Sequence, residues 1–102
     1  MKAKAVIFQI KPGKNEEVIR LFSNFIVPGA KKHKGFKGGL LLTDSDSGKA
    51  MSIALWETEN DIKMSEESGY YKEWVARLSD FIAVPPVREI YDVSNLTDLI
   101  VK

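Results

Sequence analysis

The side chains of this chain that could do chemistry gather where one strand-like segment ends. Trp56 closes that segment, and Tyr70 and Tyr71 follow after a polar stretch. An indole offers a flat apolar wall and one N–H donor, and a phenol can donate a hydrogen bond or, when ionised, accept one. We expect one tyrosine to face inward, and favour Tyr71 because it shares a helical stripe with Trp74. Trp56 and Tyr71 are therefore candidate catalytic residues, although each could instead be a ring of the core.

One imidazole, two amides and a second indole complete the set of candidates. His33 is the single histidine, and its ordinary pKa suits proton transfer near neutral pH. It is a candidate catalytic residue, but cations beside a helix C-terminus also fit a solvated position. Gln9, Asn24 and Trp74 are candidate substrate-binding residues. A solvated position is the alternative for Asn24, and Gln9 could face either the helices or a subunit seam.

Other chemistries lack the residues they require. The chain has no cysteine, which excludes disulfides, thiol catalysis and thiolate ligands. Histidine and carboxylate residues show no metal-like spacing, and no phosphate loop or dinucleotide fingerprint occurs, so we predict neither metal nor cofactor. A net charge of +1 does not favour a nucleic-acid or membrane partner. No apolar run is long enough to cross a bilayer and no signal-peptide pattern is evident, so we expect a cytoplasmic protein.

The periodicity of the apolar residues predicts one domain over residues 1–102. Strands are expected at residues 4–10, 36–43, 49–57 and 87–93. Helices are expected at residues 59–67 and 70–82 and from residue 15, where Pro28-Gly29 either ends the helix near residue 26 or kinks it on to about residue 32. This order, βαββαβ, predicts an α+β, ferredoxin-like fold with a four-stranded antiparallel sheet and both helical regions on one face.

The second face of that sheet should not be left in water. Residues 5–8 and 40–42 are apolar on both strand parities, whereas a half-exposed antiparallel sheet alternates apolar and polar residues. Soluble monomers rarely expose such a patch, so we expect a homodimer packed through the sheet face. The apolar residues of the tail, 94–102, would lie at the dimer interface, or the tail would fold back over its own sheet.

The chain resembles the antibiotic biosynthesis monooxygenase (ABM) superfamily of dimeric α/β barrels over about residues 5–93. The resemblance rests on four features: a first strand followed by Lys11-Pro12-Gly13 and a helix; Gly35-Phe36 at the second strand; Ala54-Leu55-Trp56-Glu57-Thr58 leaving the third strand, with Ser65-Glu66-Glu67-Ser68 before an aromatic helix; and the closing strand 89–93. None of these is a catalytic signature, and fold alone does not fix function.

The resemblance implies a cofactor-independent monooxygenase, in which a small aromatic or polyketide-like substrate is deprotonated in an apolar pocket and reacts directly with oxygen. The matching tryptophan would be Trp56. Heme-degrading relatives use a histidine on the last helix and an asparagine on the first strand, and this chain has neither residue there. The alternative function is a non-catalytic dimeric module that binds a small hydrophobic metabolite, or a scaffold whose pocket is filled.

Overall fold

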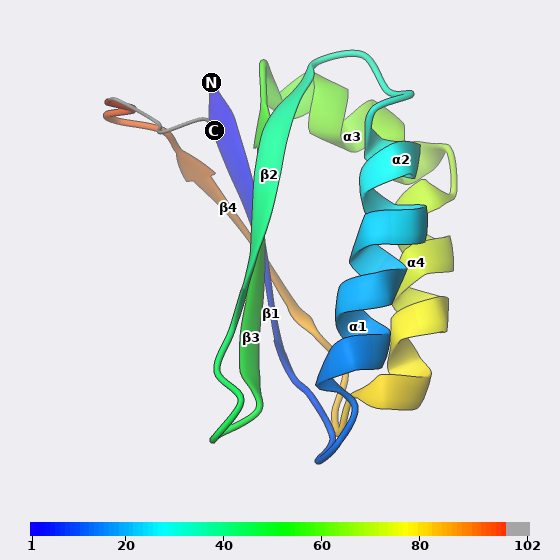
Figure 1. Ribbon diagram of the computed structural model, residues 1–102. Helices are drawn as coiled ribbons and strands as arrows, with labels where there is room; N and C mark the ends of the chain where they lie inside the picture. Colours follow the sequence, from blue (N-terminus) through cyan, green and yellow to red (C-terminus); the bar gives the residue numbers. More distant parts are fainter. Residues whose placement is uncertain (98–102) are drawn as a thin grey trace.

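A computed structural model describes residues 1–97 and shows one layer of sheet against one layer of helices (Figure 1). The sheet is antiparallel, in the order β2-β3-β1-β4. Its strands are β1 (Lys2–Gln9), β2 (Phe36–Thr43), β3 (Lys49–Trp56) and β4 (Val87–Asp92). The predicted α+β, ferredoxin-like fold is therefore confirmed. Three strands end one residue earlier than predicted, and β1 begins two residues earlier, at Lys2, so Lys4 lies inside the strand rather than at its start.

The first helical region continues through Pro28 instead of ending before it. It comprises α1 (Asn15–Leu21), the π-helical turn η1 (Phe22–Ile26) and α2 (Val27–Ala30). In the wide turn the amide of Val27 donates to the carbonyl of Phe22, five residues back. Proline has no N–H and its ring crowds the preceding turn of a helix. The π turn lies immediately before Pro28, where a wider helix relieves that crowding.

The second helical region is split as predicted. It comprises α3 (Glu59–Glu67), α4 (Tyr70–Leu78) and the short 3-10 helix η2 (Ser79–Phe81). Thr58 caps α3, because its hydroxyl accepts a hydrogen bond of 3.1 Å from the amide of Asp61. Gly69 separates α3 from α4 with a φ of 90°, a left-handed conformation that glycine adopts without a steric penalty.

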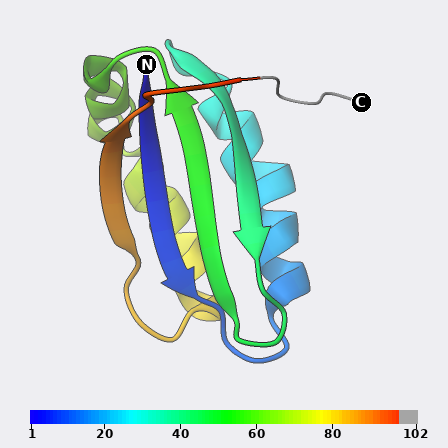
Figure 2. The same cartoon turned by 90° about the vertical axis from the view of Figure 1, so that its left-hand side faces the viewer.

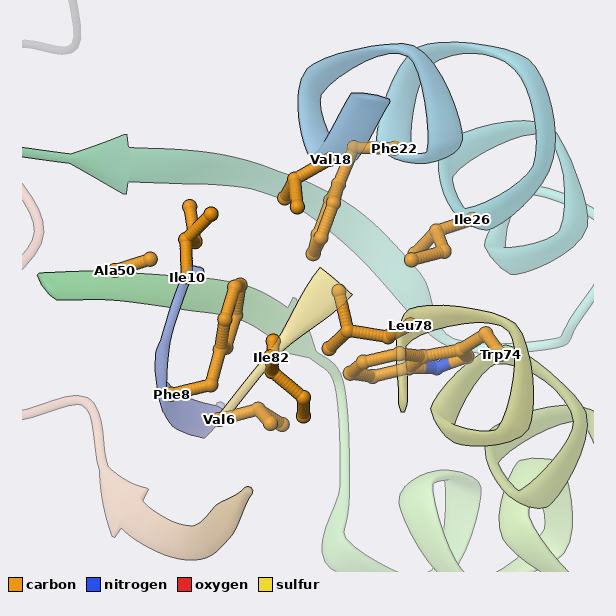
Figure 3. Close-up of a cluster of buried hydrophobic side chains, with 10 residues drawn as sticks. All are labelled: Val6, Phe8, Ile10, Val18, Phe22, Ile26, Ala50, Trp74, Leu78 and Ile82. Carbon is orange, nitrogen blue, oxygen red and sulfur yellow. The ribbon is translucent and has the colours of Figure 1, made fainter. Parts of the chain in front are cut away.

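The hydrophobic core lies between the helices and the near face of the sheet (Figure 3). Phe8 of β1 stacks on Phe22 of η1, with ring centroids 6.3 Å apart, and Phe22 meets Trp74 of α4 edge to face at 6.0 Å. The remaining core side chains are aliphatic: Val6, Ile10, Val18, Ile26, Ala50, Leu78 and Ile82. These contacts fix the helices above β1 and β3 at one end of the sheet.

The other face of the sheet carries no helix (Figure 2). Large apolar side chains on it are about half exposed: Leu40, Leu42, Val87 and Tyr91. After β4 the chain passes in front of this face near the N-terminus, where the side chains of residues 94–97 are exposed. The rest of the predicted interface tail, residues 98–102, lies outside the described residues.

Candidate functional site

A cavity of about 400 Å³ lies between the sheet and the helical layer. This volume falls within the range of small-molecule sites, about 300–1,000 Å³. Its walls come from β1, β2 and β3 on one side and from α1, η1, α2, α3 and α4 on the other. Most of the lining is apolar or aromatic: Val6, Ile19, Phe22, Ile26, Val27, Ala30, Phe36, Leu41, Ala54, Trp56, Tyr70 and Trp74. Leu40 and Ile53 also border the cavity, although the strand register places their side chains on the open face. The polar lining side chains are Lys4, Ser23, Thr43, Ser52 and Ser65.

Trp56 is the lining residue with an unmet hydrogen bond. Its side chain is 2% exposed, and Phe36 packs edge to face on it at 5.4 Å. Its Nε1–H is buried and has no hydrogen-bond partner within residues 1–97. A buried indole N–H ordinarily finds a partner, and leaving a buried donor unpaired costs about 1–3 kcal/mol. A ligand oxygen in the cavity would supply the missing acceptor.

The two tyrosines of α4 both pack against the core, and Tyr71 meets Trp74 edge to face at 4.9 Å. Tyr70 lines the cavity, whereas Tyr71 does not. The Tyr70 hydroxyl donates to the carbonyl of Ile26, and burial raises its pKa to about 12. A Cβ on Gly29 would overlap the Tyr70 ring, so only glycine allows this close approach of α2 to α4. The Tyr70 ring is therefore held in place in the cavity wall by its contacts with η1 and α2, and its hydroxyl is not available as a base.

Tyr71 forms part of a charged cluster next to the cavity, which no local sequence pattern indicated. The ammonium of Lys4 lies 3.5 Å from the Tyr71 ring centroid and 6.0 Å from that of Trp74. It also forms an ion pair with Glu66 of α3, at 2.8 Å. Arg88 of β4 binds the same carboxylate through two nitrogens, at 2.5 and 2.9 Å. Lys4 is itself a lining residue, so this cluster abuts the cavity through its side chain.

The environment of the cluster changes its ionisation. Burial is the main cause that lowers the pKa of Lys4 to about 8, and the charge of Arg88 lowers this pKa further. The hydrogen bond and the charge of Glu66 act in the opposite direction and raise it. Burial by itself would raise the pKa of Glu66, but hydrogen bonds from Arg88 and Lys4 outweigh it and the pKa lies below its usual value. Burial also raises the pKa of Tyr71, as does the charge of Glu66. Lys4 is thus the one member of the cluster whose pKa approaches neutral pH.

The other predicted residues divide between the cavity and the surface. Trp74 is 4% exposed and lines the cavity. His33 lies outside it, with its ring 5.0 Å from that of Tyr70. Asn24 is exposed on η1. Gln9 points to the open face of the sheet, where its amide nitrogen donates to the carbonyl of Ser47. The structure thus brings Trp56 and Trp74 together, but not His33, Asn24 or Gln9.

Residues 1–97 hold neither a metal site nor a membrane-spanning helix. No group of three or more histidine, aspartate or glutamate side chains is placed to hold a metal ion there. Within the same residues, every helix is too short or too polar to cross a membrane.

Comparison with known proteins agrees with the fold. Residues 3–77 match the family model described as antibiotic biosynthesis monooxygenase. No curated protein sequence matches the chain.

Several solved structures share the fold at low sequence identity. A monooxygenase of Streptomyces coelicolor, ActVA-Orf6 in complex with nanaomycin D, has a TM-score of 0.80 at 16% identity, over 97% of this chain and 92% of its own. SnoaB, a cofactor-independent oxygenase from Streptomyces nogalater, has a TM-score of 0.78 at 14% identity, over 93% and 94%. A putative antibiotic biosynthesis monooxygenase of Nitrosomonas europaea has a TM-score of 0.75 at 19% identity, over 93% and 100%.

Proposed function

Because the chain belongs to the antibiotic biosynthesis monooxygenase family, we propose that it oxidises a small aromatic or polyketide-like molecule with molecular oxygen and without a cofactor. The observation that carries the proposal is the buried, unpaired Nε1–H of Trp56 in the wall of the apolar cavity. This donor would hold a carbonyl or phenolic oxygen of the substrate. The flat faces of Trp56 and Trp74 would pack against its rings.

The reaction needs no external reductant, because the substrate supplies the electrons that reduce one oxygen atom of O₂ to water. A ring CH₂ activated by a neighbouring carbonyl loses a proton to give an enolate, and the resulting carbanion carbon reacts with O₂. One oxygen atom remains on that carbon as a carbonyl, and the other leaves as water together with both hydrogens. An N–H donor at the substrate oxygen stabilises the negative charge that develops there, which lowers the barrier to losing the proton.

The test is oxygen uptake with a panel of hydroxylated anthrones and phenols, comparing the native protein with Trp56→Phe. Phenylalanine keeps an apolar ring and removes the N–H. We expect uptake by the native protein and a fall in kcat of about 10²-fold in the variant. Far-ultraviolet circular dichroism and the unfolding midpoint show whether the variant retains its fold. Binding without oxygen consumption by the native protein would rule out the oxygenase and leave the alternative, a non-catalytic module that binds a hydrophobic metabolite.

We also propose that two copies pack through the open sheet faces. Leu40, Leu42, Val87 and Tyr91 are between 47% and 54% exposed there, and soluble monomers rarely leave such a face in water. A two-fold arrangement would cover both faces with the same residues, and residues 94–97 would reach the neighbouring subunit. Sedimentation equilibrium should report a dimer at micromolar concentration, and Leu42→Glu should shift it to monomer. A native protein that sediments as a monomer would contradict this arrangement.

A further inference from the structure

The charged cluster beside the cavity is not electrically balanced. Lys4 and Arg88 carry two positive charges, and both pair with the single carboxylate of Glu66. Within residues 1–97 no other carboxylate lies within ion-pair distance of either cation. Glu66 faces Lys4 from α3 and Arg88 faces it from β4, while α4 contributes the rings of Tyr71 and Trp74. The cluster therefore carries one more positive charge than negative. The side chain of Arg88 is 38% exposed and also feels the charge of Glu59, whereas that of Lys4 is buried.

Lys4 is the cation of this pair that a ligand in the cavity would approach. Its side chain is 7% exposed and belongs to the cavity wall, whereas Arg88 does not line the cavity. The register of the sheet pairs Lys4 with Ala54, so Lys4 and Trp56 are diagonal neighbours on the same face. One wall of the mostly apolar cavity thus includes the buried lysine Lys4 and, two residues along the neighbouring strand, an unpaired N–H donor.

We propose that the cavity binds phenols and enols in their ionised form, with Lys4 facing the negatively charged oxygen and Trp56 donating a second hydrogen bond to the ligand. This inference deepens the proposed function, on which it rests, because it names the class of molecule that the same cavity takes. An anion buried without a countercharge is strongly disfavoured, whereas one beside a buried ammonium group that shares its only carboxylate with an arginine is held firmly. A neutral ligand of the same shape gains nothing from that charge.

The lowered pKa of Lys4 agrees with this assignment. Burial and the charge of Arg88 both oppose the protonated amine in the empty site. An incoming phenolate would offset both effects and raise the pKa of Lys4. By the same coupling Lys4 would lower the pKa of the bound phenol. In the complex the proton should therefore reside on the Lys4 amine rather than on the ligand oxygen.

The experiment uses 4-nitrophenol, whose ionised form absorbs at a longer wavelength than the neutral form, and 4-nitroanisole, its methyl ether that cannot ionise. Binding of both is measured for the native protein, Lys4→Met, Trp56→Phe and Lys2→Met. Lys2 lies on the same strand outside the cavity and is the matched control. We expect the native protein and Lys2→Met to lower the apparent pKa of bound 4-nitrophenol. Lys4→Met should lose that effect and bind 4-nitrophenolate about tenfold or more weakly, with 4-nitroanisole unaffected.

Each outcome separates this inference from the oxygenase proposal. Equal affinity of Lys4→Met and native protein for 4-nitrophenolate, or an equal pKa of the bound phenol, overturns the inference even if oxygen uptake is observed. Failure of the native protein to bind either probe also overturns it. Anion binding that depends on Lys4, without oxygen uptake on any substrate, supports the inference and rules out only the oxygenase.

Discussion

Lys4 should lower the stability of the protein at neutral pH, and this can be measured as a pH dependence. The pKa of Lys4 falls from an ordinary value of 10.5 to about 8 in the folded protein. Below pH 8 the amine is protonated in both the folded and unfolded states, and the folded state bears the full penalty. Above pH 10.5 the amine is neutral in both, and the penalty is gone. Between these limits the unfolded chain binds a proton that the folded protein does not, so stability rises with pH.

The size of the effect follows from the same two values. At about 1.4 kcal/mol for each pKa unit, the complete rise is at most about 3 kcal/mol. About 2 kcal/mol of it falls between pH 7 and pH 9.5. Methionine at position 4 would fill the same space without a titrating group, and Glu66 would keep its two-nitrogen contact with Arg88. We therefore expect Lys4→Met to equal or exceed the native protein in stability at pH 7, since replacing a buried ion with an apolar side chain is often neutral or stabilising.

The assay is urea unfolding of native protein and Lys4→Met at pH 7.0, 8.0, 9.0 and 9.5. The contributions of groups that titrate in both proteins cancel when one free energy of unfolding is subtracted from the other. The difference therefore reports the titration of Lys4. From pH 7.0 to pH 9.5 the free energy of unfolding of the native protein should rise by about 2 kcal/mol relative to that of Lys4→Met. Lys2→Met is the control, because hydrogen bonding to Asp92 raises the pKa of Lys2 and moves its titration above this window. A difference that stays flat, or falls as the pH rises, would refute the lowered pKa of Lys4 and the penalty that follows from it.

Three further predictions test the elements that shape the cavity. Gly29→Ala should destabilise the protein by up to about 2 kcal/mol, because the clash with the Tyr70 ring costs more than the gain in helix propensity. In a Tyr70→Leu background, where that ring is gone, Gly29→Ala should instead stabilise the protein. Gly35→Ala should cost more than about 2 kcal/mol, since Gly35 has a φ of 88° and its Cβ would overlap the carboxylate of Asp61; a loss below about 1 kcal/mol would contradict this. Thr58→Ala should cost about 1 kcal/mol by removing the α3 cap, and Thr58→Ser should restore most of it. Urea unfolding measures all three.

The elements were predictable from the sequence because each follows from a local pattern. The helix at residues 59–67 has its predicted bounds, and the four strands follow from apolar runs between turn residues. The course of the first helix past Pro28 was not predictable. It depends on a π turn whose only sequence signal is a proline that could equally have ended the helix. That turn also places Phe22 and Ile26 in the cavity wall.

The site was only partly predictable, because it depends on which side chains of a helix face the cavity and on contacts between elements that are distant in the sequence. Trp56 and Trp74 were recognised from their positions at the end of a strand and on a helical stripe. Tyr70 and Tyr71 lie four and three residues before Trp74, so both fall on the Trp74 side of α4, and the helical stripe alone does not fix which ring lines the cavity. Lys4 was missed because the apolar run predicts a strand that begins at that residue, where a lysine would be solvated.

The parity of Lys4 gave the available signal. Lys4 shares a strand face with Val6 and Phe8, both of which are in the core. A lysine on an apolar face is rarely buried without a partner. The partners, however, are contributed by two other elements, and nothing local in the sequence links them to Lys4. The buried charge could therefore be suspected from the strand pattern, but not its neighbours.

The position of Lys4 also bears on whether the cavity is used. A scaffold with a filled core would gain stability from methionine or leucine there, because the ammonium group contributes a penalty of about 3 kcal/mol at most and Glu66 already has Arg88 as a partner. An unpaired indole N–H in the same wall adds a second unfavourable feature. Unfavourable groups cluster where a protein binds or transforms a ligand, since the ligand relieves them. Lys4 and Trp56 line one mostly apolar cavity from adjacent strands, and the proposed anionic ligand would relieve both unfavourable features at once.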